Sequence, residues 1–385
     1  MFFRLAWGAF LLTCGLATVC EAMDRVTIKN DSDTNDSAAT VELVGTIEVE
    51  AQDGGILLRD RTNALFPLTP DKIVSKSSDD RVFEFLTVEE IKTRILSELP
   101  AGFSVHQTAN YLIFYDTSLA FAQWSGSLFE RLHDIFYNFW KNKGVELETG
   151  DVPMIAILLS SKEQYRNLAS DELGAAVENV IGYYNMQTNK IVAYDLTGAD
   201  SGLSARSGRG TNAAQISQIL RQPNALRLVA TIVHEATHQL AYNSGLQVRL
   251  ADMPRWYSEG LAIYFETPDL QSKKGWSSIG KVNTVRLKRF QSRFGRRNPE
   301  ALKKLLTDDS LFNDPQTALD AYSESWALTH FLIKKYPKEY AQYAQNLSQK
   351  SPFIWDDPDQ RIKEFESVFG PWQNIDRELI RFFSR

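Results

Sequence analysis

Residues 231–240, TIVHEATHQL, constrain the fold more than any other stretch of the chain. His234 and His238 are four positions apart, so on a helix they share one face and can direct two imidazoles at one metal ion. Glu235 would then lie beside that ion, where its carboxylate can accept a proton from a bound water. The chain has only five histidines, so chance is a poor explanation of this pairing. The alternative is a helix whose histidines merely contact neighbouring charges.

A second motif, PRWYSEGLAIYFE at residues 254–266, is expected to supply the third protein ligand that a catalytic zinc site needs. Glu259 lies there in an amphipathic stretch. Its small neighbours would let this helix press closely against the first: Ser258, Gly260 and Ala262. Glu266 follows by seven positions, two helical turns, and is expected to hydrogen-bond to the site from outside the ligand set. Either glutamate could instead be an ordinary solvated residue.

The two motifs together resemble the gluzincin group of zinc metallopeptidases. In that group, HExxH is followed on a second helix by a glutamate ligand in a W-x-x-E-G-x-A context, which stands here as Trp256, Glu259, Gly260 and Ala262. From about residue 90 to the C-terminus, the chain is similar to an exported bacterial family grouped with peptidase-MA-like proteins, domain of unknown function 1570. The stretches that carry this similarity are ELPAGFSVHQTANYLIFYDTS, SGSLFERL, IGYYNMQTNKIVAYDL, TIVHEATHQLAYNSGL, WYSEGLAIYFETPDL and AYSESWALTHFL.

The resemblance implies a zincin-like fold with one Zn²⁺ per chain. The roles it implies are zinc ligation by His234, His238 and Glu259, and general-base catalysis by Glu235. Gluzincins often stabilise the oxyanion with a Tyr or His that follows the third ligand, and Tyr322 matches that position, with His330 and Tyr264 as rivals. A helix-packing role for Tyr322 is an equal alternative.

The N-terminal segment has the layout of a secretory signal. One arginine precedes an apolar run from Leu5 to Val19, with small residues near Ala22, so residues 1–22 are predicted to be a signal peptide and the protein to be exported, periplasmic or extracellular. The run is short for a membrane span, and no stable membrane insertion is expected. Cys14 and Cys20, the two cysteines, both lie in this segment, so a cleaved chain would have no disulfide; a lipid anchor on a cysteine is the alternative.

The net charge of −6 argues against a nucleic-acid-binding protein, which would need a basic bias. Residues 281–304 are a local exception, because they are strongly basic with interleaved apolar residues. A surface helix with its charged face in water is the plainer interpretation. A weak contact with an anionic polymer or membrane surface is the alternative.

Periodicity predicts an α+β fold in which a small β module precedes the catalytic domain. Residues 23–40 include the polar run NDSDTNDSAAT and are expected to be a flexible leader. Residues 41–87 contain short alternating runs, which predict a three- or four-stranded sheet or partial barrel. Residues 88–385 are expected to form one zincin-like domain, with a mixed sheet and the HExxH helix up to about residue 245 and a mostly helical half over 246–385.

Within that domain, the apolar run VPMIAILLSS predicts a central strand. NVIGYYN and NKIVAYDL predict a hairpin, and we expect residues 189–196 to be the edge strand that pairs with an extended peptide. His106 and His133 have no partner at metal-ligand spacing. Residues 198–213 are expected to be a surface loop. The helices predicted after Glu266 are 281–293, 299–306, 315–336, 337–347, 359–368 and 374–383.

These features predict a zinc-dependent hydrolase, most simply a peptidase with a peptide or protein substrate. The alternative is a zincin-like binding or scaffold protein of the cell envelope with a structural or inactive metal site. Glu235 favours catalysis, because a purely structural site has no use for a base beside the metal. Nothing in the sequence selects a side-chain pocket, so specificity and the choice between endo- and exopeptidase stay open.

Overall fold

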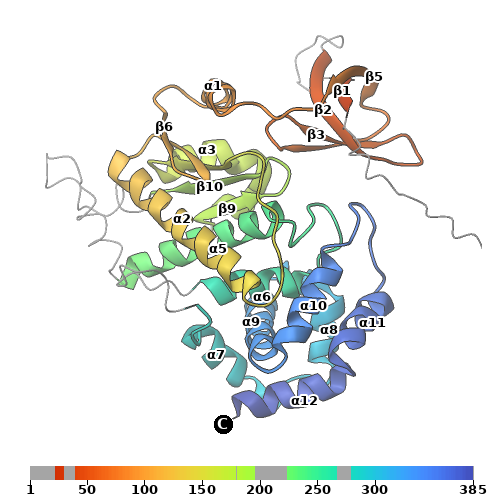
Figure 1. Ribbon diagram of the computed structural model, residues 1–385. Coiled ribbons are helices and arrows are strands. Elements are labelled where there is room, and N and C mark those ends of the chain that lie inside the picture. The colour runs from red at the N-terminus through yellow and green to blue at the C-terminus, as the bar shows by residue number, and fades with distance from the viewer. Residues whose placement is uncertain (1–21, 30–39, 179, 196–222, 267–278, 385) are drawn as a thin grey trace, which may run out of the picture. The chain divides into compact units, whose positions relative to one another are not determined.

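The computed structural model describes residues 22–29, 40–178, 180–195, 223–266 and 279–384 (Figure 1). Almost all of the predicted signal peptide and the whole 198–213 stretch lie outside these ranges. The chain divides into two compact units. The smaller one comprises Met1–Arg61 and Phe66–Phe85, and the larger one comprises Thr62–Leu65 and Leu86–Arg385.

The smaller unit is a five-stranded sheet with the strand order β4-β3-β2-β1-β5. Its strands are β1 (Ala22–Lys29), β2 (Thr40–Glu50), β3 (Ile56–Asp60), β4 (Leu65–Leu68) and β5 (Ile73–Val82). The strand β1 pairs antiparallel with both β2 and β5. Its small core is formed by Val26, Ile56, Leu58 and Leu68.

Two expectations about this module are wrong. Residues 23–29, expected within a flexible leader, form most of β1 in the interior of the sheet, and the sheet has five strands rather than three or four. The physical reason lies in the short run RVTIK, where Val26 is fully buried and Ile28 packs against the same core. The polar residues that suggested a leader begin only after this strand.

The larger unit contains a mixed five-stranded sheet with the order β6-β7-β8-β10-β9. Its strands are β6 (Ser104–Gln107), β7 (Tyr111–Tyr115), β8 (Met154–Leu159), β9 (Gly182–Asn185) and β10 (Lys190–Tyr194). The strand β8 is buried along its whole length and pairs in parallel with β7 and β10, so the predicted central strand is confirmed. The outer pairs, β6–β7 and β9–β10, are antiparallel.

Helices cover both faces of this sheet (Figure 1). Alternate residues of β7 enter opposite cores: Leu112 and Phe114 pack with the side of α1 (Val88–Glu98) and α3 (Lys162–Leu173), whereas Tyr111 and Ile113 pack with the side of α2 (Leu119–Lys141) and α5 (Pro223–Asn243). The period of two along a strand makes this division. The sheet therefore supports α5, the helix that carries the HExxH motif.

The second half of the larger unit is helical, as predicted. Its α-helices are α6 (Arg255–Phe265), α7 (Thr284–Gln291), α8 (Ala301–Thr307), α9 (Ala318–Lys335), α10 (Pro337–Leu347), α11 (Pro358–Phe369) and α12 (Trp372–Phe383). Short 3₁₀ turns occur at Gly174–Glu178, Phe294–Arg296 and Asp309–Phe312. Within the described ranges, no helix is both long enough and apolar enough to cross a membrane.

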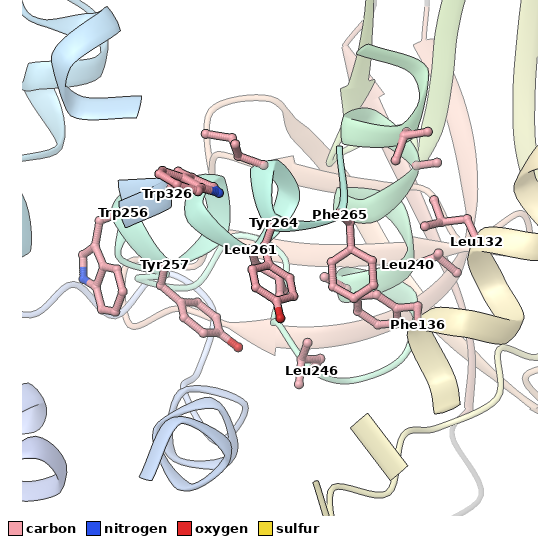
Figure 2. Close-up of a cluster of buried hydrophobic side chains, with 14 of the residues drawn as sticks. Leu132, Phe136, Leu240, Leu246, Trp256, Tyr257, Leu261, Tyr264, Phe265 and Trp326 are labelled. Atoms are coloured by element: carbon pink, nitrogen blue, oxygen red, sulfur yellow. The ribbon is translucent and has the colours of Figure 1, made fainter. Parts of the chain in front are cut away.

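The helix α6 lies between the sheet-containing half and the helical half, and it is buried on nearly every side (Figure 2). Toward the sheet, Phe265 packs against Phe136 of α2, with 5.4 Å between ring centroids. Toward the helical half, the Trp256 ring stacks on Tyr343 of α10 at 5.7 Å. Because α6 is enclosed from both sides, the position of any side chain on it is set by the packing of the whole unit.

Candidate metal centre

The helix α5 presents His234 and His238 on one face, one turn apart. Their Nε2 atoms lie 3.1 Å from each other, and each side chain is 14% exposed. The opposite face of the helix is anchored in the core, where the following residues are essentially inaccessible: Leu228, Val229, Ile232, Val233, Ala236 and Leu240. The prediction that His234 and His238 share one helical face is therefore confirmed.

Glu259 of α6 brings a carboxylate oxygen to the same point. Its Oε2 lies 3.1 Å from Nε2 of His234 and 3.7 Å from Nε2 of His238. In the described part of the chain, these three residues form the one group of three or more acidic, His or Cys side chains whose donor atoms converge closely enough to hold a metal ion. The sequence motifs on two separate helices thus meet in space.

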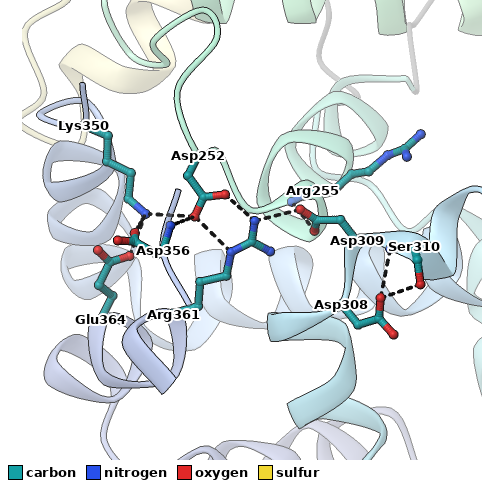
Figure 3. A network of polar contacts seen from close by, with 9 residues as sticks. All are labelled: Asp252, Arg255, Asp308, Asp309, Ser310, Lys350, Asp356, Arg361 and Glu364. Atoms are coloured by element: carbon teal, nitrogen blue, oxygen red, sulfur yellow. Dashed lines mark hydrogen bonds and ion pairs between the residues drawn. The ribbon is translucent and has the colours of Figure 1, made fainter. Parts of the chain in front are cut away.

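A buried polar network holds the start of α6 in place (Figure 3). Pro254, the residue before the helix, provides no side-chain cap, and the backbone N–H of Arg255 donates instead to Oδ1 of Asp309 at 3.1 Å. The guanidinium of Arg361 from α11 donates to Oδ2 of the same Asp309 at 2.8 Å and also pairs with the buried Asp252. An acceptor from another element thereby satisfies a helix-terminal donor that would otherwise be unpaired.

Hydrogen bonds on the far side of each imidazole set its orientation. Nδ1 of His234 lies 2.7 Å from Oε1 of Glu266, and a carboxylate can only accept, so this Nδ1 carries a proton. Nδ1 of His238 lies 3.3 Å from Oγ of Ser258, which itself donates to Oε1 of Gln247 at 3.0 Å. In the neutral imidazoles, both Nε2 lone pairs then point toward Glu259. This arrangement of outer partners is typical of histidines that bind a metal.

The spacing of the three donor atoms fits a zinc ion. Nitrogen and oxygen ligands lie about 2.0–2.1 Å from zinc, so two ligands at a tetrahedral angle are about 3.3 Å apart. The observed separations of 3.1, 3.1 and 3.7 Å lie close to that value. Two imidazoles and one carboxylate are also the donor set of known catalytic zinc sites.

The electrostatics of the cluster favour a positive charge where the donors converge. Burial by itself lowers the pKa of His234, but hydrogen bonds with Glu259 and Glu266 outweigh it and raise that pKa well above its usual range. Burial would raise the pKa of Glu259, yet its hydrogen bonds with His234 and His238 hold that pKa well below its usual range. A proton and a divalent cation therefore compete for the same place.

Glu235 points toward the edge of the sheet. Its Oε2 accepts a hydrogen bond from the backbone N–H of Tyr184 in β9, at 2.8 Å. Burial raises the pKa of this carboxyl, against the opposing charges of His234 and His238. A carboxyl with a raised pKa can both accept and return a proton near neutral pH.

Tyr322 of α9 lies within electrostatic reach of the cluster. Burial raises the pKa of its hydroxyl to about 12, and the nearby charge of Glu259 acts in the same direction. The ring stands edge-on to Phe312, at 5.2 Å between centroids.

The two rivals of Tyr322 lie in other surroundings. Tyr264 is about 140° around α6 from Glu259, at 100° per residue. His330 contacts a set of aromatic rings on α6, α9 and α12: Tyr264, Trp326, Phe382 and Phe383.

Two local expectations are corrected. Residues 189–196 do not contain the edge strand: β10 lies between β8 and β9, and β9 occupies the edge, because the first strand of the hairpin folds back on the outer side. Gly260 does not serve the contact with α5. A Cβ there would lie 2.7 Å from the carbonyl oxygen of Ser325 and 2.1 Å from Oγ1 of Thr329, so the glycine permits close packing against α9.

Several polar partners of the site are not evident from the sequence. In the sequence, Ser258 stands out only for its small size, and nothing there points to its contact with His238. No sequence motif points to Gln247. The backbone amide of Tyr184 cannot be predicted either, because the backbone donor is the same at every non-proline residue. His106 and His133 lie outside the cluster: His106 is next to Gly126, and His133 stacks on Tyr137 at 4.4 Å.

Comparison with known proteins identifies part of this region. Residues 228–354 match the family described as "Protein of unknown function (DUF1570)". The matched segment holds Glu259, Tyr322 and the HExxH residues, and it covers roughly a third of the chain rather than everything after residue 90. No curated protein matches the chain.

Proposed function

We propose that this protein is a zinc-dependent hydrolase of the zincin-like, gluzincin type, and that it cleaves peptide bonds. One Zn²⁺ per chain would be held by His234, His238 and Glu259. The observation that carries the proposal is the convergence of these three donor atoms, with the outer nitrogen of each imidazole already occupied by Glu266 or Ser258. Three protein ligands would leave one position of a four-coordinate zinc ion for water, as catalysis requires.

The chemistry divides between the metal and the side chains. A bound zinc ion lowers the pKa of its water and polarises a carbonyl. Glu235 accepts the proton of the attacking water at its carboxylate and returns it to the nitrogen of the leaving amine. The N–H of Tyr184 orients the carboxylate for both steps. Tyr322 is the proposed donor to the oxyanion, because its hydroxyl remains protonated at neutral pH, with a pKa of about 12.

The position of β9 favours a peptide over another amide. In the described part of the chain, β9 pairs with β10 alone, and the amide of Tyr184 faces away from β10, toward Glu235. An extended peptide can pair through its backbone with the groups of this strand edge that Glu235 does not occupy, without a side-chain pocket. A peptide lying along β9 would pass the general base.

The second candidate is a zincin-like binding or scaffold protein of the cell envelope, in which the metal is structural or the cleft inactive. The contact between Glu235 and β9 speaks against it, since a structural site gains nothing from a buried carboxylate beside the metal. Both candidates share the metal ligands. Removing the base distinguishes them, because only the hydrolase loses an activity.

The test compares Glu235→Gln with Glu259→Gln. The first change should leave zinc content and melting temperature nearly unaltered while reducing cleavage of a peptide library about 10²–10⁴-fold, the usual cost of losing a general base. The second should lower zinc content, because a ligand and its charge are removed together. Glu163→Gln on the exposed side of α3 is the matched control. Cleavage that is equally fast in the Glu235→Gln and unmodified proteins would rule out the proposed mechanism.

We also propose export after removal of residues 1–22. N-terminal sequencing of the secreted protein should then begin near Met23. Retention of residues 1–22, or a lipid on Cys20, would contradict this proposal.

A further inference from the structure

A continuous series of side-chain contacts connects the candidate metal centre to α7. Nε of Arg255 lies 3.6 Å from Oε1 of Glu259, and its guanidinium lies over the Phe312 ring, 5.1 Å from the centroid. Phe312 meets Tyr322 edge-on, and the guanidinium of Arg286 lies over the Tyr322 ring at 5.6 Å. Arg286 of α7 therefore covers the same tyrosine that is proposed to serve the oxyanion.

Around α7 and the start of α9, the arginine side chains outnumber the carboxylates that pair with them. Arg289 and Arg293 both pair with Asp320, each at 2.7 Å. Among the residues that the structure describes, neither Arg286 nor Arg296 makes an ion pair. A cavity of about 240 Å³ opens here and is lined by Arg289, Ser292, Arg293, Arg296 and Asp320. Three arginines thus surround one aspartate in a space large enough for a carboxylate side chain.

We propose that Arg286, Arg289, Arg293 and Arg296 form a subsite that binds acidic side chains of the peptide substrate. The substrate class is then peptides with Asp or Glu to one side of the cleaved bond. This inference rests on the proposed peptidase function, because only then does an anionic group held by these arginines belong to a substrate. A planar guanidinium with several fixed donors suits a carboxylate, and Arg286 and Arg296 have donors to spare.

The geometry separates substrate binding from structural support within this group of arginines. Arg289 and Arg293 already neutralise Asp320, so removing either would break one of the two ion pairs of a partly buried carboxylate. Arg286 and Arg296 can change without breaking an ion pair among the described residues. The double variant Arg286→Gln, Arg296→Gln is therefore the informative one. Its melting temperature should stay close to that of the unmodified protein, because it breaks no ion pair among the described residues, although it loses the cation–π contact of Arg286 with Tyr322.

The test is direct binding, measured by fluorescence anisotropy with labelled hexaglutamate and labelled hexaglutamine on the full chain. Hexaglutamate should bind more tightly than hexaglutamine, and its affinity should fall as salt rises, because partly exposed charges are screened. The double variant should bind hexaglutamate about tenfold more weakly, as expected for two lost exposed ion pairs. Lys338→Gln, an exposed charge on α10, should bind as the unmodified protein does.

Two further arms identify the source of any binding. The His238→Ala variant, in which the metal site is disabled, should still bind hexaglutamate. If this variant loses hexaglutamate binding while the double variant keeps it, the peptide binds to the metal and the subsite is disproved. An oligothymidylate of six nucleotides that binds as tightly as hexaglutamate, with the same loss in the double variant, would overturn the assignment to acidic peptides. Equal hexaglutamate affinity in the double variant rejects this inference and leaves the proposed function standing, whereas undiminished cleavage by Glu235→Gln rejects the proposed mechanism, even if hexaglutamate still binds to these arginines.

Discussion

Replacing Gly260 by alanine tests whether the packing of α6 against α9 positions Glu259, the proposed metal ligand next to it. The added Cβ would lie 2.1 Å from Oγ1 of Thr329, 3.1 Å from its Cβ and 2.7 Å from the carbonyl oxygen of Ser325. The threonine hydroxyl can rotate away, but the carbonyl belongs to the backbone of α9. The two helices must therefore separate by roughly half an ångström to restore ordinary contact distances.

The size of the effect depends on two opposing contributions. Overpacking a core costs about 1–3 kcal/mol, and alanine regains about 1 kcal/mol of helix propensity over glycine. Because the clash includes a backbone atom of α9, the overpacking cost should lie in the upper half of that range, so the net loss in the free energy of unfolding should be about 1–2 kcal/mol. This loss lowers Tm by roughly 2–3 °C for a unit of about 300 residues. Because Glu259 precedes the substituted residue, the same displacement should weaken zinc binding, by about tenfold if the ligand moves half an ångström.

Thermal unfolding and zinc titration against a competing chelator would measure both quantities. Gly295→Ala is the matched control: its Cβ would meet nothing within 4 Å, so stability should stay the same or rise slightly. Adding Thr329→Ala to Gly260→Ala removes the shortest contact and should recover part of the loss. A Gly260→Ala protein as stable and as tight for zinc as the unmodified one would refute the close packing. A less stable protein with unchanged zinc affinity would refute the link to Glu259.

Two more predictions concern side chains around the core. Glu266→Gln should lower zinc affinity about 10–100-fold with little change in stability, since it weakens the partner of the His234 Nδ1–H; zinc competition on both proteins decides this. Burial lowers the pKa of His330 to about 4, so the unfolded chain binds a proton more readily than the folded one between pH 6.5 and 4, and stability falls as the pH drops through that window. The loss from pH 7 to pH 5 should be about 2 kcal/mol, and His330→Phe should abolish that share of it in denaturant unfolding; an equal pH dependence in both proteins would contradict the buried neutral state.

Short-range patterns in the sequence are sufficient to predict the helix and the strand that position the candidate metal ligands. The spacing of four between His234 and His238 implies a shared helical face in any fold, because the geometry of a helix is local. The apolar run of β8 likewise indicates a strand buried on both sides, and the structure confirms it. The residue ranges of the helices after Glu266 could be predicted for the same reason, from the periodicity within each segment.

Strand order could not be predicted in this way. Periodicity predicts the hairpin of β9 and β10, but which of the two reaches the edge depends on which one pairs with β8, some thirty residues earlier. The same holds for β1, whose burial requires β2 and β5 on either side. Strand order is determined by pairing between segments that are distant in the sequence, and the periodicity of a single strand does not indicate which strand it pairs with.

The arrangement of the site was also settled by contacts between distant residues. The sequence supplied Glu259 as a candidate ligand, but its distance from His234 depends on α6 being enclosed between Phe136 and α10, and on Asp309 capping its start. The sequence suggests that Gly260 faces α5, and its actual contact with α9 depends on the rotation of α6 within that packing. Residue types and helical spacing are properties of the chain itself, whereas the angle at which one helix meets another is a property of the filled core.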